Sequence, residues 1–345
     1  SSFPMLLVGL GVQGLAASGI FPAASAVVGD TFPPEKHGRA LGVLGAVFGV
    51  AFVIGPILAG VLLSVASWPW LFWISLPLAA LVGLLGWRVL PAARTPSDRP
   101  LDAGGMATLG ALLVALAYGG NQIDAQAVGA SLLRPEVGAP LLIAVALVPV
   151  FVRLERRAED PLLRLELFAS RQVRIASVLA AGAGLTEAAF IFFPDLAVAG
   201  FGVSSSTASF MLLPLVVAVA LGSPVAGRVL DRTGSRAVVL TGTALLAVGF
   251  AFVGGLPSLR AAFYGGSVAI GLGLACLLGS SLSYILLRAS TAAERTVAQG
   301  VISLFLGLGQ LTGGALIGAV AASGPTGAAG YAQAFLLIAA VAAAL

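Results

Sequence analysis

Residues 40–87 form one run of 48 positions without an acidic or basic side chain. A helix needs about 20 apolar residues to cross a bilayer, so this run is too long for one crossing, and the cluster Ser67-Trp68-Pro69-Trp70 divides it. Over the whole chain, 59% of residues are hydrophobic and 9% are charged, against about 25% charged in soluble domains. Because a folded surface needs charges to stay solvated, we predict a polytopic membrane protein.

Eleven apolar ranges, separated by polar or charged clusters, predict eleven membrane-spanning helices. The apolar runs are continuous rather than alternating, which favours helices over the strands of a barrel. We therefore expect an all-α membrane fold. In chain order the ranges are 3–28, 40–65, 71–89, 104–120, 137–152, 175–196, 207–227, 237–255, 261–287, 297–320 and 328–345.

The basic residues alternate between the predicted loops. Sixteen of the 18 fall in every second loop, and the loops between them hold only Arg134 and Arg260. Since Arg-rich loops stay in the cytoplasm, we expect the basic loops to be cytoplasmic, Ser1 to lie outside, and the protein to reside in a plasma or inner membrane. Basic residues spread in this way, with few aromatic neighbours, do not indicate a nucleic-acid partner.

Enzymatic and metal chemistry find little support. The chain has one cysteine, Cys276, and one histidine, His37, which excludes an internal disulfide framework and a Cys-based or His-pair metal site. Paired acids, a nucleophile with a base and a phosphate-binding Gly-rich Lys-Ser/Thr loop are also missing from the sequence. We expect no metal, no cofactor and no enzymatic activity.

Two apolar ranges resemble each other. Residues 42–60 align with residues 300–318 and share four glycine positions. A parallel repeat of two helical bundles is one way in which transporters are built. Glycine is common in membrane helices, so chance similarity is the alternative explanation.

Three stretches carry a family resemblance. Residues 51–60, Ala-Phe-Val-Ile-Gly-Pro-Ile-Leu-Ala-Gly, and residues 227–236, Gly-Arg-Val-Leu-Asp-Arg-Thr-Gly-Ser-Arg, are the longer two. The third is Val12-Gln13-Gly14. They resemble, in order, the fifth-helix antiporter motif, the loop motif between the second and third helices of a bundle, and the end of the fourth-helix motif of the major facilitator superfamily, in its fourteen-span drug:proton antiporter branch. One departure is Leu10, where the family has an Arg linked to proton handling.

The resemblance implies that the eleven spans are helices four to fourteen of fourteen, and that the first three are missing. Residues 1–90 would be the second half of an N-terminal six-helix bundle, residues 91–160 a two-helix linker, and residues 161–345 a C-terminal six-helix bundle. The implied function is proton-coupled export of amphipathic or lipophilic small molecules, including drugs, by alternating access. The alternative is an exporter of a specific lipid, metabolite or siderophore. The implied partners are the small-molecule substrate, protons and the lipid bilayer, with the protein a monomer.

Glu187 is the most telling ionisable residue. Counting from Ile175, it lies about 18 Å into a core about 30 Å thick. A carboxyl group at this depth is costly and usually faces a cavity or a partner, so we predict that it exchanges between proton and substrate. The alternative is a protonated Glu that hydrogen-bonds to a neighbouring helix. Five polar residues are candidates for a cavity shared with Glu187, or else for interhelical hydrogen bonds. They are Gln310, Thr312, Ser280, Ser283 and Tyr284.

The remaining candidates concern conformational change. The antiporter motif supplies a rocking contact between the bundles or a static kink, because Pro interrupts helical hydrogen bonding and Gly allows close approach. Its residues are Gly49, Gly55, Pro56 and Gly60. The loop motif supplies a gate or a solvated turn, in which Asp231 caps the following helix or pairs with a neighbouring Arg. Its residues are Gly227, Asp231, Arg232, Gly234 and Arg236. We expect Asp30 to pair with Lys36 or Arg39.

Overall fold

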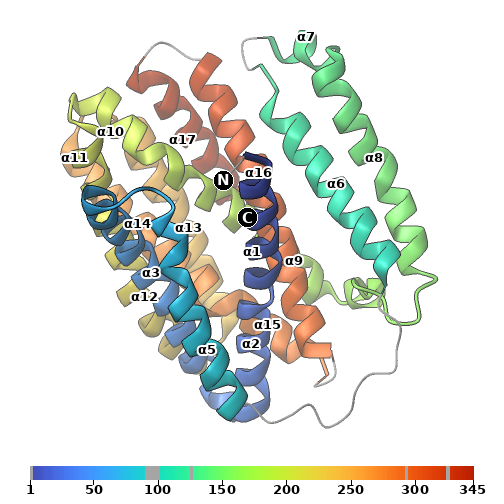
Figure 1. Ribbon diagram of the computed structural model, residues 1–345. Helices are drawn as coiled ribbons and strands as arrows, with labels where there is room; N and C mark the ends of the chain where they lie inside the picture. Colours follow the sequence, from blue (N-terminus) through green and yellow to red (C-terminus); the bar gives the residue numbers. More distant parts are fainter. Residues whose placement is uncertain (1–2, 90–101, 125–126, 292–293, 324–326) are drawn as a thin grey trace.

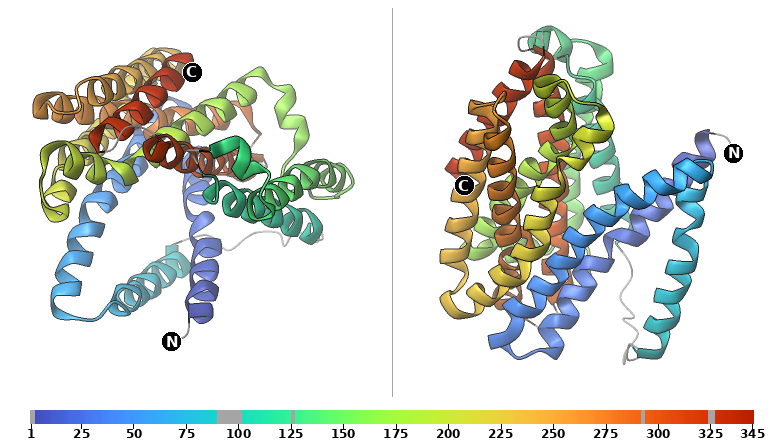
Figure 2. Two further views of the ribbon diagram at one scale, coloured as in Figure 1. Left: turned by 90° about the horizontal axis from the view of Figure 1, so that it is seen from above. Right: turned by 90° about the vertical axis from the view of Figure 1, so that its left-hand side faces the viewer.

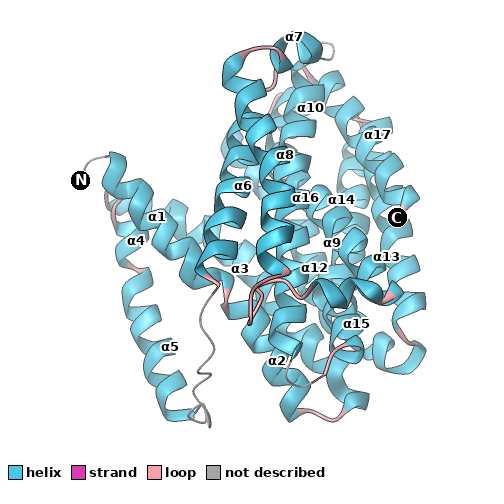
Figure 3. Cartoon of the chain, turned by 90° about the vertical axis from the view of Figure 1, so that its right-hand side faces the viewer, coloured by secondary structure: helices cyan, strands magenta, loops and turns pink. Residues whose placement is uncertain are grey.

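The computed structural model describes residues 3–89, 102–124, 127–291, 294–323 and 327–345, and these are helical with short turns and contain no strand (Figures 1 and 3). This confirms the all-α expectation. Each of the eleven predicted ranges coincides with a helix or a run of consecutive helices. Within the described residues, nine such runs are long and apolar enough to cross a bilayer, and the number of crossings in the whole chain remains a prediction.

The first group of helices covers residues 3–89. Its first predicted span is broken at Gly19, and its third begins with a separate helical turn, Trp70–Trp73, in which three of the four residues are aromatic. A short 3-10 turn at Pro34–Lys36 connects the first span to the second. The helices are α1 (Phe3–Ser18), α2 (Ile20–Thr31), α3 (His37–Val65), α4 (Trp70–Trp73) and α5 (Ser75–Val89).

A helical hairpin follows. It consists of α6 (Ala103–Asn121), the short α7 (Val128–Leu132) and α8 (Pro135–Glu155). The first long helix begins where the Asp102 carboxylate accepts a hydrogen bond from the Gly105 amide at 2.8 Å, a standard N-cap. α6 lies between α8 and the long helix α16 (Figure 1).

The third group holds most of the buried apolar side chains. Phe193 is fully buried at its centre, with its ring centroid 5.0 to 6.4 Å from those of Phe250, Phe263 and Phe335. Such tilted and edge-on ring pairs add to the stabilisation from burial. The helices are α9 (Arg171–Ala188), α10 (Phe193–Phe201), α11 (Ser205–Phe210), α12 (Leu213–Thr233), α13 (Ser235–Gly255), α14 (Arg260–Cys276), α15 (Leu282–Ala289), α16 (Arg295–Ser323) and α17 (Ala328–Ala344).

The first and third groups meet at one end of the molecule and diverge towards the other (Figure 2). We call the end at which α2 and α12 finish and α3 and α16 begin the basic end, because Lys36, Arg39, Arg232 and Arg295 lie there. The helices of the two groups therefore lie farther apart away from the basic end (Figure 2).

The two similar ranges form the two longest helices, α3 and α16, with 29 residues each. Their matched glycines do not make matching contacts. Gly42 and Gly49 pack against α12, whereas Gly300 and Gly307 have no atom within 4 Å of where a Cβ would stand. The contacts of these four glycines therefore do not support a repeat of residues 42–60 in residues 300–318.

α9 and α16 pack with their backbones almost in contact. A Cβ on Gly309 would collide with the carbonyl oxygen of Ala181, and one on Gly184 with that of Leu306. Small residues at helix contacts permit this approach in membranes. The contact fixes the position of Glu187 on α9 relative to Gln310 on α16.

Gly309→Ala is therefore expected to destabilise the protein by about 1–3 kcal/mol, as overpacking against a backbone atom does. The matched control is Gly307→Ala, two residues away on the same helix, where the added methyl group meets open space and the higher helix propensity of Ala is neutral or favourable. Thermal unfolding of the purified protein in detergent measures both. Equal melting temperatures for the two variants would contradict the packing described.

Candidate functional site

A cavity of about 320 Å³ lies between the first and third groups of helices. We call it the central cavity. Its walls come mainly from α1, α3, α12, α15, α16 and the π-helical turn Leu277–Ser281, and α9 contributes Glu187. Most of the lining is apolar, and Glu187 is the single ionisable side chain among the lining residues. The polar lining residues are Ser18, Glu187, Ser223, Ser283 and Ser303.

Glu187 is held on the last turn of α9, about 24 Å from the start of that helix at Arg171. One side of the residue faces the central cavity, and the Gln310 side chain hydrogen-bonds to the carboxyl group. Its Oε2 atom is buried and has no hydrogen-bond partner among the described residues. The carboxyl group therefore both faces a cavity and contacts a neighbouring helix, and its exchange between proton and substrate stays a prediction.

The five polar candidates separate into different environments. Ser283 lines the central cavity with Glu187. Gln310 contacts Glu187 from the side, whereas Ser280 is fully buried outside the cavity lining. The Thr312 hydroxyl donates to the Leu308 carbonyl oxygen at 2.8 Å. A shared cavity is thus wrong for Ser280 and Thr312, whose direction around the helix axis the sequence did not reveal.

Tyr284 is the fifth candidate, and it too lies away from the central cavity. It packs in a small apolar cluster between the two groups of helices, with Val28, Leu41 and Leu287. The Arg288 guanidinium lies 4.9 Å from the centre of its ring, a cation–π contact. The expectation that Tyr284 lines the cavity is therefore wrong, and its ring belongs to the contact at the basic end.

Asp231 joins the two groups of helices. Its two carboxylate oxygens accept hydrogen bonds from the backbone amides of Gly38 at 2.7 Å and Arg39 at 2.8 Å. These amides belong to the first turn of α3, where the helix dipole favours an anion. The expected cap on the following helix is wrong, because α13 begins after Gly234 without a side-chain cap. Gly234 has φ of +78° at this turn, a value that favours glycine.

The same end of α3 lies against α12 backbone to backbone. A Cβ on Gly227 would collide with the Gly38 carbonyl oxygen, and one on Gly42 would stand 2.6 Å from the Ser223 carbonyl oxygen. Further along α3, a Cβ on Gly49 would stand 2.6 Å from the Cα of Ala220. Gly227 and Gly49 thus come from the two recognised motifs and act in one interface.

Other motif residues lie apart from this interface. Gly55 has no neighbour within 4 Å of where its Cβ would stand, and Arg232 and Arg236 are exposed. The surroundings of Pro56 and Gly60 lie outside what the structure describes, although both belong to α3. Gly55 and the two arginines are also outside the central-cavity lining.

Gln13 and Gly14 lie on α1, far along the chain from Glu187 and outside the central-cavity lining. Gln13 lines a shallow hollow with Trp68, Phe72 and Trp73. Gly14 is exposed, with no neighbour within 4 Å of where its Cβ would stand. Leu10 lines the same hollow as Gln13.

An ion pair at the basic end also joins the two groups of helices. The guanidinium of Arg295 donates to the Asp30 carboxylate at 2.5 Å and to the Gly29 carbonyl oxygen at 2.6 Å. The predicted partners of Asp30, Lys36 and Arg39, are wrong because the first residue of α16 occupies this position. A cation at the C-terminal end of α2 is also favoured by the helix dipole.

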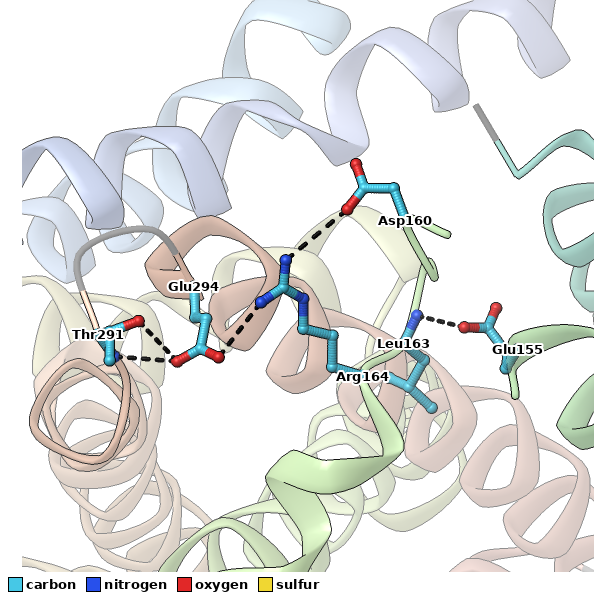
Figure 4. Close-up of polar contacts among 6 residues, drawn as sticks. All are labelled: Glu155, Asp160, Leu163, Arg164, Thr291 and Glu294. Atoms are coloured by element: carbon cyan, nitrogen blue, oxygen red, sulfur yellow. Dashed lines mark hydrogen bonds and ion pairs between the residues drawn. The ribbon is translucent and has the colours of Figure 1, made fainter. Parts of the chain in front are cut away.

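The connector between α8 and α9 carries a small polar network (Figure 4). Arg164 lies 3.2 Å from Glu294 and 3.7 Å from Asp160. The Thr291 hydroxyl and amide donate to the other Glu294 oxygen at 2.7 and 3.2 Å. These hydrogen bonds from Thr291, followed by Arg164, hold the pKa of Glu294 below its usual range. The Glu155 carboxylate accepts from the Leu163 amide at 2.8 Å and ties α8 to the connector.

Known proteins resemble this chain in sequence. The family described as Major Facilitator Superfamily matches residues 1–215 and 175–345. The chain is 32% identical over 313 residues to the Bacillus subtilis "Uncharacterized MFS-type transporter YfiU", covering 89% of this chain and 60% of that protein. It is 30% identical to Bacillus subtilis "Multidrug resistance protein 3" over 68% of this chain and 46% of that protein. The chain thus spans about half to three fifths of the length of these relatives.

Two more comparisons concern resistance and fold. The chain is 26% identical to the Listeria monocytogenes "Lincomycin resistance protein LmrB" over 73% of this chain and 53% of that protein. Its fold is similar to the crystal structure of the human organic anion transporter MFSD10, with a TM-score of 0.60 at 18% identity, covering 94% of this chain and 66% of that one. This second likeness shows the arrangement of helices alone.

Asp231→Ala is expected to lower the stability of the purified protein by about 1–2 kcal/mol, the usual effect of losing a helix cap. Here the cap joins two groups of helices, so the loss also loosens the basic end. The control is Asp124→Ala, in an exposed ion pair 4.0 Å from Arg134 at the opposite end, where such pairs contribute little. Thermal unfolding in detergent compares them, and equal losses would contradict the bridging role.

The Glu294 contact predicts a pH dependence of stability. Because the pKa of Glu294 is lower in the folded protein, its contribution is present above the pKa of the unfolded chain and is lost as the pH falls through the lower folded value. The wild type is therefore expected to exceed Glu294→Gln in melting temperature between pH 7 and 5, with a difference that shrinks below about pH 4.5. Glu159→Gln, an exposed residue of the same connector, is the control. A difference that grows on acidification would contradict the assignment.

Proposed function

The chain belongs to the major facilitator superfamily, and on this premise we propose that it works as a drug exporter of the fourteen-span drug:proton antiporter branch. The observation that carries the proposal is Glu187, a single carboxyl group on a mostly apolar cavity between two groups of helices. Resistance proteins among the relatives support a drug as cargo. The helical hairpin α6–α8, placed between the two groups in the sequence, fits the additional helices of that branch.

The central cavity favours an amphipathic or lipophilic substrate. Its volume of about 320 Å³ falls at the small end of ligand pockets. Apolar walls bind apolar surface by the hydrophobic effect, and serine hydroxyls with one carboxylate would orient a substrate that carries a cation or a hydrogen-bond donor. A specific lipid, metabolite or siderophore remains the alternative cargo on the same fold.

Proton coupling would follow from competition at one carboxyl group. An ionised Glu187 attracts a cationic or donor-bearing substrate, and a protonated Glu187 releases it. A buried ionisable group inside a membrane is stable only beside a cavity, a partner or a bound proton. In this scheme inward proton flow supplies the free energy for export.

Alternating access would use the basic end as its closed gate. If the basic end is cytoplasmic, as positive charge favours, then the contacts of Asp231 with α3 and of Arg295 with Asp30 hold the cytoplasmic side shut. The helices diverge at the opposite end (Figure 2), which corresponds to an outward-facing arrangement. Opening towards the cytoplasm would then break these few polar contacts. It would also separate the backbones of α3 and α12, which lie against each other at glycines and not through interlocking side chains.

The function is tested with the complete protein in proteoliposomes that carry a pH gradient. We expect ethidium transport to depend on that gradient, and to lose the dependence in Glu187→Gln, because the amide cannot bind or release a proton. The matched control is Asp195→Asn, an exposed acid eight residues further on in α10, which should transport at the wild-type rate.

Two outcomes would overturn the proposal. Ethidium transport by the wild type that ignores the gradient would reject proton-coupled drug export. Wild-type gradient dependence in Glu187→Gln would remove Glu187 from the coupling. Saturable counterflow distinguishes a transporter from a channel, which conducts without saturation.

A further inference from the structure

A second cavity, of about 650 Å³, lies between α6 and α16. We call it the lateral cavity. Figure 1 shows these two helices side by side, with α8 beyond them. The walls include apolar residues such as Val114, Ala117 and Ala315, and the polar lining is formed by Tyr118, Asn121, Gln122 and Gln310. The hairpin helix α6 thus shares a partly polar cavity with α16, and the proposed function assigns no role to this cavity.

The lateral cavity and Glu187 lie at one level of the molecule. Tyr118 and Gln310 each lie about 22 Å from the beginning of their helices at the basic end, and Glu187 about 24 Å from the beginning of α9. The cavity therefore reaches the depth of the carboxyl group. Asn121 and Gln122 mark its other side, where α6 ends away from the basic end.

Gln310 connects the two cavities. Its side chain lines the lateral cavity and hydrogen-bonds to the Glu187 carboxyl group, which in turn lines the central cavity. The Oε2 atom of Glu187 is buried without a partner among the described residues. An oxygen in this state accepts a proton or a water molecule readily, because a buried acceptor without a partner is unfavourable.

We propose that the lateral cavity is a water-filled route by which protons reach Glu187 while substrate still occupies the central cavity. The proposal rests on the proposed role of Glu187 in coupling. A ligand that fills about 320 Å³ of mostly apolar space leaves little room for water beside the carboxylate. Four polar side chains offer the two to four hydrogen bonds that a confined water needs, so the lateral cavity can be hydrated at the same time.

The proton transfer involves one donor and one acceptor. A hydronium ion in the lateral cavity loses a proton, an O–H bond forms on the Glu187 carboxylate, and a water molecule remains. The hydrogen bond from Gln310 weakens as the carboxylate becomes neutral, since bonds to charged groups are about twice as strong as neutral ones. Gln310 is in this scheme a positioning residue, which holds the carboxylate towards the lateral cavity.

Among the described residues, the elements packed against α9 place no other charged side chain at the depth of Glu187. The elements packed against α9 are α15, α16, α17 and the turns Leu165–Ala169, Leu277–Ser281 and Ala189–Phe192. Their charged groups are Glu166, Arg288 and Arg295, all at the basic end. Tyr331 is the titratable group of α17. It lies in the first turn of that helix, away from the basic end. A pH effect on coupling would therefore report on Glu187.

The test fills the lateral cavity in the complete protein. Ala117→Phe places a ring among the lining residues, and Ala111→Phe adds the same ring on α6 outside the lining. Proteoliposomes with saturating ethidium report proton uptake through an internal pH dye, and ethidium counterflow without a pH gradient reports transport that needs no net proton transfer. We expect Ala117→Phe to slow ethidium-coupled proton uptake several-fold and to leave counterflow unchanged.

A second measurement does not depend on transport rates. Gln310→Cys in a Cys276→Ser background should react with a membrane-impermeant thiol reagent from outside in the presence of saturating ethidium. Complete protection by ethidium, or equal proton uptake in Ala117→Phe and Ala111→Phe, overturns the lateral route. If Glu187→Gln is uncoupled while Ala117→Phe behaves like the control, the route alone fails. If Glu187→Gln stays coupled, the proposed function fails.

Discussion

The close approach of α3 and α12 is the contact on which the arrangement of the two groups depends. Glycines at positions 38, 42 and 227 remove the side chains that would keep the helix backbones apart. That approach brings the first turn of α3 within hydrogen-bond distance of Asp231. Without the glycines the carboxylate could not reach the two amides, and without the carboxylate those amides would lose their partner. The glycine packing of α3 against α12 and the capping of α3 by Asp231 therefore depend on each other.

In the proposed transport cycle, the α3–α12 contact would form a gate that is both firm and reversible. Interdigitated large side chains would resist separation, because each must change rotamer. Flat glycine surfaces separate without such changes, and the capping hydrogen bonds can be replaced by water at the molecular end. A contact with little shape interlocking but several polar bonds would suit the gate that we propose, which has to open during alternating access.

Much of the fold could be predicted from the sequence, since bilayer thickness dictates the length of an apolar run. All eleven predicted ranges are helical, and even the division near Trp68 was visible as a cluster of aromatic and turn residues. Pairings between distant segments could not be predicted. Asp30 and Arg295 are 265 positions apart, and nothing local indicated that Arg295, rather than Lys36, would meet Asp30. The same holds for Asp231 and Gly38, which are 193 positions apart.

The candidate site shows the same limit at the scale of one helix. The depth of Glu187 followed from counting residues along α9, and its cost in a membrane marked it as important. Which face it presents did not follow, because the apolar runs carry almost no amphipathic signal: small and large apolar residues surround every helix. Ser280 and Ser283 are three residues apart, yet only Ser283 reaches the central cavity. The π-helical turn Leu277–Ser281 adds a residue to the helical repeat just before Ser283, and it rotates the following side chains relative to a regular helix. A local irregularity, invisible in composition, thus decides which hydroxyl group faces the central cavity.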